Sequence, residues 1–252
     1  MCTVVILRRP GHRWPLLIAA NRDEMLDRPW TPPAHHWPDR PEVVAGRDTL
    51  AGGTWLGIND DGVIAAVMNR PGSLGPAEDK RSRGELVLEA LDHAAAGEAA
   101  AALAHIDPAA YRPFNLLVAD AVDAVWLRSD PDAGPDRVEG FAIPEGLSML
   151  TAHDRNDRHS ERIRTYLPRF EAAAAPDPDA GDWSDWERLV ASRDQGETGG
   201  APSAMNIVTD FGFGTVSSAL MALPAHEADD ARPIWRFAAG RPDEVPFEPV
   251  AL

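Results

Sequence analysis

The order of apolar and helix-forming segments predicts an α+β layered domain. Short β-branched runs fill the first part of the chain, an alanine-rich helical stretch follows, and further strands and helices come after residue 113. This order lacks the regular alternation of strand and helix that indicates a parallel sheet. The 252 residues, 44% of them hydrophobic, suffice for the core of one large domain or two small ones.

Short β-branched and apolar runs predict the first strands. Residues 3–7 and 16–20 form two such runs around a Pro-Gly turn, and continuous apolar runs are typical of strands covered on both faces. Residues 28–42 hold several prolines and two tryptophans, so we expect an ordered irregular loop there. Strands at 54–59 and 63–69 flank an Asp-Asp-Gly sequence that has the chemistry of a hairpin turn.

Capping residues and apolar spacing predict the helices. Ser82 is expected to open the first helix, with Glu85 completing a capping box. Its apolar stripe continues through alanine-rich chain to Leu103. The remaining predicted elements are strands at 114–119, 124–127, 146–151, 204–208, 215–223 and 234–237 and helices at 160–170 and 183–192.

The charge balance excludes several classes of protein. The chain carries 24 Lys and Arg against 40 Asp and Glu, a formal net charge of −16, and has no basic cluster for nucleic acids or anionic membranes. No apolar run approaches the roughly 18–20 residues that span a bilayer, so we expect no stable membrane insertion. The single cysteine rules out an internal disulfide framework and indicates a reducing, cytoplasmic setting.

That lone cysteine, Cys2, is the first candidate for chemistry. Removal of the initiator Met1 would leave a thiol and an α-amine on one residue, with ordinary pKa values of about 8.5 and about 7.7–8.0. A nucleophile and a base would then be joined, which is the arrangement of N-terminal-nucleophile hydrolases. The alternative is a small buried cysteine on a strand, without a chemical role.

A polar block, Asn-Arg-Asp-Glu at 21–24, directly follows the strand predicted at 16–20. Asp23 is suited to hold an ammonium group, and Arg22 to stabilise a thiolate or orient an anionic substrate group. The alternative is a turn with local ion pairs and no ligand.

Two asparagines on predicted strands also have two interpretations each. Asn69 ends the strand at 63–69, where it either forms a turn or directs an amide N–H at a developing oxyanion. Asn115, near the start of the strand at 114–119, has the same alternatives. The glycine-rich segment at 51–57 lacks both the lysine and the following helix of a phosphate-binding loop. The histidines lack the spacing of a metal site, so we expect no metal.

Several of these blocks together resemble the NRDE family, also called the Transport and Golgi Organisation 2 family. The four residues that name it stand at 21–24, after an initial Met-Cys-Thr. Further matching blocks are Arg28-Pro29, Ala45-Gly46-Arg47-Asp48, Gly52-Gly53-Thr54-Trp55-Leu56-Gly57, Ser82-Arg83-Gly84-Glu85-Leu86-Val87, Phe114-Asn115-Leu116-Leu117 and Phe213-Gly214-Thr215-Val216-Ser217-Ser218. The resemblance covers most of the chain and implies a single NRDE-type domain over residues 1–252.

It also implies an N-terminal-nucleophile hydrolase-like fold, a four-layer αββα sandwich of two stacked antiparallel sheets. The related enzymes are the cholylglycine hydrolases and penicillin V acylases, amidases with cysteine directly after the initiator methionine. By analogy Cys2 is the nucleophile and Asp23 holds its amine. Arg22 then lies beside the thiol, and Asn69 contributes to the oxyanion hole.

Two positions depart from the pattern of these relatives. The amidases carry a second asparagine soon after a Leu-Thr pair, where this chain has Ala152 and His153, and a late-strand arginine is replaced by Val216. Loss of one oxyanion donor costs about 2.7–4 kcal/mol of transition-state stabilisation in serine-protease-type sites. His153 is the residue that would replace the missing donor.

We therefore expect a cytoplasmic N-terminal cysteine amidohydrolase that cleaves a small-molecule C–N amide through an acyl-enzyme, without a cofactor. The first alternative is a non-catalytic protein on the same fold that binds and carries haem or an acyl metabolite. The second is a structural protein with an inert Cys2. Beyond the catalytic set, the expected substrate-binding residues are Asn21, Arg47, Trp55, Arg83, Asn115 and His153.

Overall fold

The computed structural model describes residues 2–130, 136–197, 199–228 and 230–252. The chain divides into two compact units, one made of Met1–Arg28 with Glu145–Ala251 and the other of Pro29–Pro144 with Leu252. Each unit holds one sheet whose ladders are all antiparallel. The α+β class expected from the order of segments is confirmed.

Six strands form the sheet of the first unit. In order across the sheet they are β10 (Gly146–Leu150), β1 (Thr3–Arg8), β2 (Leu16–Met25), β11 (Phe213–Leu223), β12 (Ile234–Ala238) and β13 (Glu248–Pro249). β2 pairs with β11 along its whole length, with a bulge between Thr215 and Ser217. The central strand β2 is therefore flanked on both sides, by β1 and by β11.

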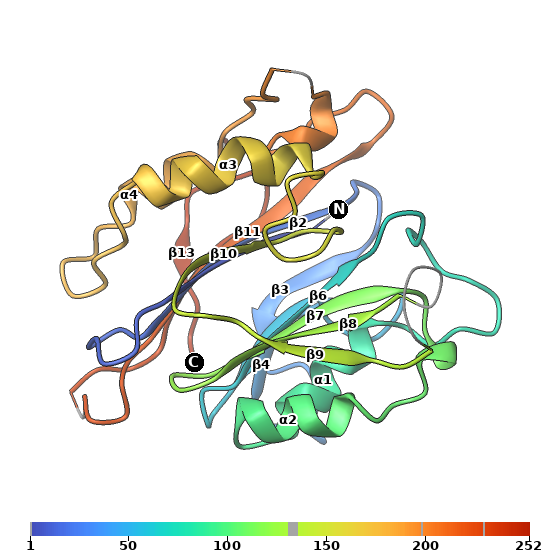
Figure 1. Ribbon diagram of the computed structural model, residues 1–252, viewed down its shortest axis with the longest axis horizontal. Helices are drawn as coiled ribbons and strands as arrows, with labels where there is room; N and C mark the ends of the chain where they lie inside the picture. Colours follow the sequence, from blue (N-terminus) through green and yellow to red (C-terminus); the bar gives the residue numbers. More distant parts are fainter. Residues whose placement is uncertain (1, 131–135, 198, 229) are drawn as a thin grey trace. The chain divides into compact units, whose positions relative to one another are not determined.

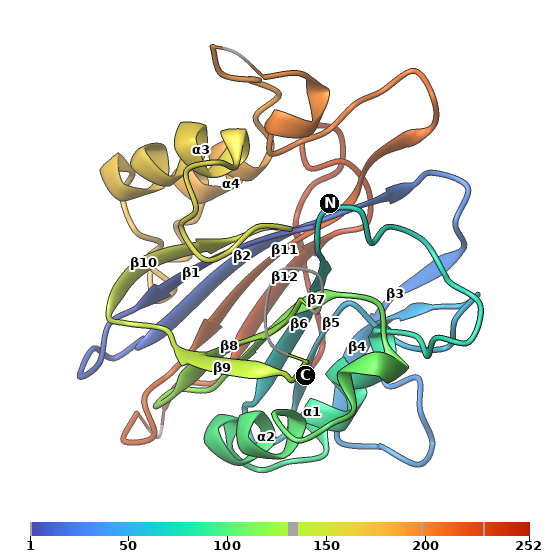
Figure 2. The same cartoon turned by 45° about the vertical axis from the view of Figure 1, so that its right-hand side comes forward.

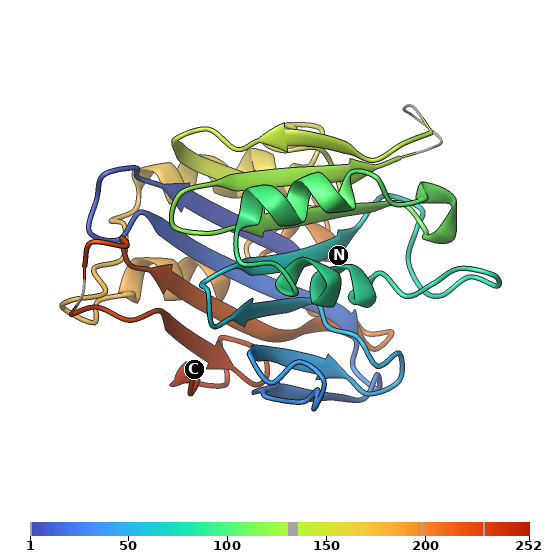
Figure 3. The same cartoon turned by 90° about the horizontal axis from the view of Figure 1, so that it is seen from below.

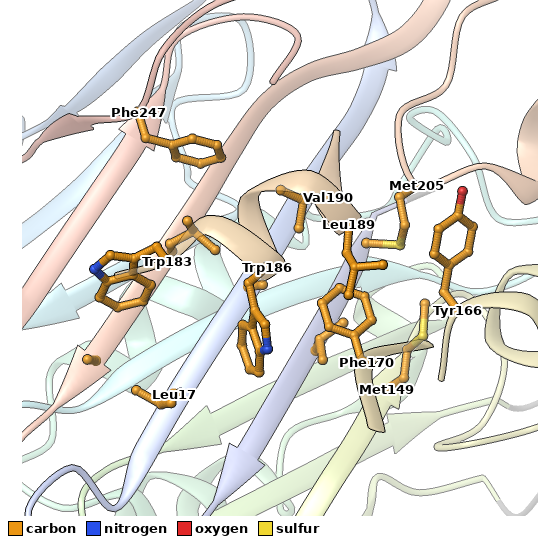
Figure 4. Close-up of a cluster of buried hydrophobic side chains, with 14 of the residues drawn as sticks. Leu17, Met149, Tyr166, Phe170, Trp183, Trp186, Leu189, Val190, Met205 and Phe247 are labelled. Atoms are coloured by element: carbon orange, nitrogen blue, oxygen red, sulfur yellow. The ribbon is translucent and has the colours of Figure 1, made fainter. Parts of the chain in front are cut away.

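Two helices, α3 (Glu161–Ala172) and α4 (Ser184–Val190), lie along one face of this sheet (Figure 1). The hydroxyl of Ser160 caps α3 by accepting a backbone N–H of its first turn. Between helices and sheet lies a large apolar cluster, in which the rings of Phe170 and Trp186 meet edge to face at 5.5 Å (Figure 4). None of the helices in the described part of the chain has the length and apolarity to cross a membrane.

Seven strands form the sheet of the second unit. In order they are β3 (Trp30–Ala34), β4 (Val43–Asp48), β5 (Leu56–Asn59), β6 (Ile64–Asn69), β7 (Phe114–Ala119), β8 (Ala124–Ser129) and β9 (Glu139–Ala142). Helices α1 (Gly84–Leu91) and α2 (Ala96–Leu103) lie across one face of it (Figures 2 and 3). A second apolar cluster, with Leu86 and Leu116 fully buried, joins these helices to the strands.

Close packing explains the glycine-rich segment at 51–57. A Cβ on Gly53 would lie 2.6 Å from the carbonyl carbon of Gly84, so the two backbones cross where a side chain has no room. A Cβ on Gly46 would lie 2.4 Å from the ring of Trp55. Three of the family-like blocks therefore meet through their glycines, at the start of α1 and along β4.

The polar block at 21–24 lies inside a strand, where we expected it to follow one. β2 runs on to Met25, because Asn21 pairs with Thr3 on one side and Ser218 on the other. The ladder continues on the β11 side as far as Phe213. Flanking strands thus supply backbone partners that the local sequence does not reveal.

The helix expected from Ser82 to Leu103 begins and ends differently. Arg83 is the N-terminal flanking residue of α1 and has no side-chain cap, while Glu85 bonds the guanidinium of Arg81 at 2.8 Å. The capping-box prediction is wrong, because this arginine takes the carboxylate. The helix is also interrupted, since the Asn59 amide donates to the carbonyls of Leu91 and His93 and ends α1 there.

Other differences concern strands. β3 lies in the region expected to be an irregular loop, and β4, β9 and β13 were not predicted. The strand predicted at 204–208 is wrong: a short 3-10 helix (Ala201–Ser203) precedes irregular chain with a single bridge from Val208. Side-chain and loop partners replace a ladder there, as the N–H of Ile207 donates to the Thr215 hydroxyl at 2.8 Å.

Candidate functional site

Cys2 directly precedes β1, the strand that lies between β2 and β10. Thr3 pairs with Asn21, and Val4 pairs with Leu150. Cys2 directly precedes Thr3, so it lies beside the part of β2 that holds Arg22. The residue as a whole is partly exposed.

The Cys2 sulfur accepts a hydrogen bond from the backbone N–H of Asp23. Burial raises the pKa of the Cys2 thiol, and the charge of the Asp23 carboxylate also raises this pKa, whereas the Arg22 guanidinium lowers it. The thiol therefore keeps its proton at neutral pH. Because the thiolate is the nucleophilic form, attack by this sulfur needs a base beside it.

Strand alternation divides the residues of the polar block between the two faces of the sheet. The side chains of Asn21 and Asp23 point to the face that α3 and α4 cover, since both bond groups there. Arg22 points to the opposite face and is buried. Thr3 also contacts the helix side, so by alternation Cys2 shares the face of Arg22.

The Asp23 carboxylate is bonded through both oxygens. Its Oδ2 accepts from Nη1 of Arg162 at 2.9 Å, and its Oδ1 accepts from the Thr215 hydroxyl at 2.7 Å. The side chains of Arg162 and Asp23 are only 3% and 0% exposed. Arg162 also donates to the Thr3 hydroxyl and, at 2.8 Å, to the carbonyl of Pro202. Sequence reasoning missed Arg162, since it lies on a helix 139 positions away and no local motif marks it.

Asn21 connects the sheet to the helical layer. Both N–H groups of its amide are used, one on the carbonyl of Val190 and one on that of Met205, each at 2.9 Å. The Ser218 hydroxyl donates to its amide oxygen at 2.6 Å. These contacts give Asn21 a structural role, and they leave no amide N–H for the substrate contact expected from the sequence.

The bulge in β11 lies opposite this block. Val216, where the resemblance to the amidases implies an arginine, is 7% exposed and falls within the bulge. Ser217 pairs with Arg22 and is buried. Among the described residues its hydroxyl has no hydrogen-bond partner.

His153 follows β10 in the same unit. Its Nδ1 lies 3.8 Å from Oδ2 of Asp157, and its backbone N–H donates to the Thr151 hydroxyl at 3.2 Å. Among the described residues, no group of three or more His, Cys, Asp or Glu side chains is placed to hold a metal ion.

The second unit holds the other residues singled out from the sequence. Asn69 is half-buried at the end of β6 and pairs with Phe114. Alternation places it on the face of Val67, which packs against the helix cluster. Met68 and its partner Asn115 lie on the opposite face.

Asn115 is fully buried in a polar network. Its amide oxygen accepts from Nη1 of Arg70 at 2.8 Å and from the indole N–H of Trp126 at 3.0 Å. Arg70 also bonds Asp130 at 2.8 Å. The network links β7, β8 and the end of β6.

The remaining predicted substrate contacts lie on or beside the glycine-rich blocks. Arg47 is exposed near the end of β4. Trp55 meets the ring of Trp30 edge to face at 5.6 Å. Arg83 donates to the hydroxyl of Ser73 and to the carbonyl of Pro113, at 2.9 and 3.0 Å. The structure thus brings together Cys2, Arg22 and Asp23 within the first unit. The predicted residues that belong to the second unit are Arg47, Trp55, Asn69, Arg83 and Asn115.

Residues 1–165 match the family model described as Transport and Golgi organisation 2. The Transport and Golgi organization 2 homolog of Mus musculus is 36% identical over 110 residues, which are 42% of this chain and 38% of the mouse protein. The Homo sapiens homolog is 37% identical over 110 residues, with the same two coverages. The match thus spans 38% of the length of these curated relatives.

Solved structures extend the comparison to nearly the whole chain. The Caenorhabditis elegans ortholog of N-acylethanolamine-hydrolyzing acid amidase has a TM-score of 0.58 and 12% identity, covering 91% of this chain and 96% of its own. Penicillin V acylase from Agrobacterium tumefaciens has a TM-score of 0.52 and 14% identity, covering 94% and 83%. A mutant conjugated bile acid hydrolase from Clostridium perfringens has a TM-score of 0.54 and 10% identity, covering 100% and 97%. The expected N-terminal-nucleophile hydrolase-like fold is confirmed.

Proposed function

The chain belongs to the Transport and Golgi organisation 2 family, and from this premise and its fold we propose that it is an N-terminal cysteine amidohydrolase. Its substrate would be the C–N amide of a small molecule, and its setting the cytoplasm. One observation carries the proposal: the Cys2 sulfur contacts the backbone N–H of Asp23 and, by strand alternation, shares its sheet face with Arg22. Amide-hydrolysing enzymes of the same fold support it.

The reaction starts with removal of Met1, which frees the α-amine of Cys2. This amine takes the thiol proton while the sulfur attacks the carbonyl carbon, so a C–S bond forms and the carbonyl oxygen becomes an oxyanion. Collapse of the intermediate breaks the C–N bond, and the α-ammonium returns its proton to the leaving amine. Arg22 lowers the pKa of the thiol and so stabilises the negative sulfur.

Water completes the cycle. The α-amine accepts a proton from water, whose oxygen attacks the thioester carbonyl. The C–S bond then breaks, the α-ammonium returns its proton to the sulfur, and the acid formed loses its own proton to solvent and leaves as a carboxylate. In this scheme Cys2 supplies both the nucleophile and the base, which is why its raised thiol pKa is compatible with activity.

Intact mass spectrometry of the purified chain tests the proposal directly. We expect a mass that begins at Cys2, and a mass increase of one acyl group when an activated short-chain amide or ester is added and the reaction is stopped by acid. The variant Cys2→Ala, which keeps the amine, should show no added acyl group of the thioester type, that is, none that hydroxylamine removes. Turnover of an amide by a chain that retains Met1 would contradict the mechanism, because its base would be blocked.

Two further measurements test the predicted role of Asn69 and the carrier alternative. The oxyanion function of Asn69 stays a prediction from the resemblance, and an Asn69→Ala variant that is acylated at the rate of the parent chain would refute it. A haem titration tests the carrier alternative, in which haem binds with a changed Soret band and no acylation occurs. Binding without any acyl-enzyme would overturn the hydrolase in favour of that carrier.

A further inference from the structure

We infer that Arg162 is a positioning residue that keeps the α-amine of Cys2 uncharged, and so able to act as the base, by pairing with the Asp23 carboxylate. The inference rests on the proposed function, since it needs Met1 to be removed. It concerns a residue on α3, on the helix side of the sheet, whereas the sulfur lies on the other face.

Buried contacts fix the ion pair in place. Nη1 of Arg162 lies 2.9 Å from Oδ2 of Asp23, and both side chains are almost fully buried. The guanidinium also bonds the Thr3 hydroxyl and, at 2.8 Å, the carbonyl of Pro202. Thr215 holds the other carboxylate oxygen at 2.7 Å. Neither charge can turn away to another partner without breaking several hydrogen bonds.

Asp23 lies within electrostatic reach of residue 2. Its backbone N–H bonds the Cys2 sulfur, and its carboxylate raises the pKa of the Cys2 thiol. A lone buried carboxylate at this place would also stabilise a positive charge on the neighbouring amine. An ammonium group has no lone pair and cannot accept the thiol proton.

Arg162 removes that difficulty through its own charge. A carboxylate and a guanidinium 2.9 Å apart act on a third group as a dipole with no net charge, so their effect on it is much weaker than that of either ion. The amine therefore loses its proton more readily beside this pair than it would beside Asp23 alone. A purely mechanical role, in which Arg162 ties α3 to the sheet, would give no such effect on the amine.

The chain offers matched controls for this distinction. Arg162→Met removes the charge, and Arg162→Lys keeps it without the forked geometry. Thr215→Val removes the other hydrogen bond to Asp23, together with the one that the hydroxyl accepts from the N–H of Ile207, without changing any charge. Arg164→Met makes the same exchange on the same helix at an exposed arginine that pairs with Glu161.

The amine is titrated in the full-length Cys2→Ala background, which leaves an α-amine at residue 2 without a competing thiol. Trace acetylation with acetic anhydride at a series of pH values, read by mass spectrometry of the N-terminal peptide, gives the midpoint for the uncharged amine. Lys80, the only lysine of the chain, serves as the internal reference. We expect a midpoint of about 8 in this background.

Arg162→Met should raise that midpoint by about one pH unit or more, which leaves about tenfold less uncharged amine at neutral pH. Arg162→Lys should raise it less, and Thr215→Val and Arg164→Met should leave it in place. An unchanged midpoint in Arg162→Met, or an equal rise in Thr215→Val, would overturn the inference.

A second set of variants tests the inference if Arg162→Met does not fold. Asp23→Asn should lower the midpoint, because Arg162 is then the uncompensated charge, and the double variant Asp23→Asn/Arg162→Met should return it toward that of the background. Equal midpoints in these two variants would also overturn the inference. Retention of Met1 would overturn both proposals, whereas a shifted midpoint without any acyl-enzyme on Cys2 would overturn only the hydrolase.

Discussion

Substitution of Asn21 tests whether this residue stabilises the fold or contacts a substrate. Its amide makes three hydrogen bonds, to the carbonyls of Val190 and Met205 and from the hydroxyl of Ser218. Each bond contributes about 1 kcal/mol net, and the buried groups left without a partner add to the loss. We therefore expect Asn21→Ala to lower the free energy of unfolding by about 3–4 kcal/mol, a large share of the roughly 5–15 kcal/mol of an ordinary domain.

A double-mutant cycle isolates one of these bonds. Ser218→Ala removes only the bond to the Asn21 amide oxygen and the weaker one at 3.3 Å to the carbonyl of Ala20, so it should cost about 1 kcal/mol. The coupling energy between the two substitutions should be about 0.5–1.5 kcal/mol. Urea unfolding followed by tryptophan fluorescence measures all four proteins.

The same proteins are assayed for alkylation of Cys2 by iodoacetamide under native conditions. If Asn21 is structural, the folded fraction of Asn21→Ala should react at the rate of the parent. A loss of stability below about 1 kcal/mol, or a fully stable variant that no longer binds substrate, would refute the structural role and restore the contact expected from the sequence.

Three other predictions follow from burial and packing. Burial raises the pKa of Tyr111 to about 12, above the ordinary value of about 10 for an unfolded chain. The free energy of unfolding is therefore intact below pH 10 and falls by about 2–3 kcal/mol as the pH rises toward 12. Urea unfolding of Tyr111→Phe should lack this fall, and an equal fall in the variant would contradict the prediction. Gly46→Ala should cost about 1–3 kcal/mol and change the fluorescence of Trp55, because the new methyl group overlaps its ring. Gly97→Ala, which meets only an ordinary contact at 3.5 Å on a helix, is its control and should be neutral or stabilising. Alkylation of Cys2 should rise at a higher pH in the folded chain than in urea, because burial raises the pKa of the thiol; equal profiles would refute that burial.

Local patterns predicted most strands but not their ends or their partners. The apolar runs at 3–7 and 16–20 became β1 and β2, since β-branched and apolar residues favour covered strands whatever lies beside them. β2 continues through the polar block because β1 and β11 supply backbone partners, and polar residues alone indicate a turn. β3 escaped prediction for a related reason, since its two prolines argue against a strand and its edge position tolerates them.

The amino-acid sequence by itself determined the lone thiol, the acidic charge and the family-like blocks, because these depend on residue identity and on neighbours a few positions away. The surroundings of the thiol were decided in three dimensions. Asp23 faces Arg162 across 139 positions, and Asn21 reaches Val190 across 169. Such contacts depend on how a helix lies on a sheet. Because side chains alternate along β2, Asn21 and Asp23 point toward the helices and Arg22 points to the face of the Cys2 sulfur.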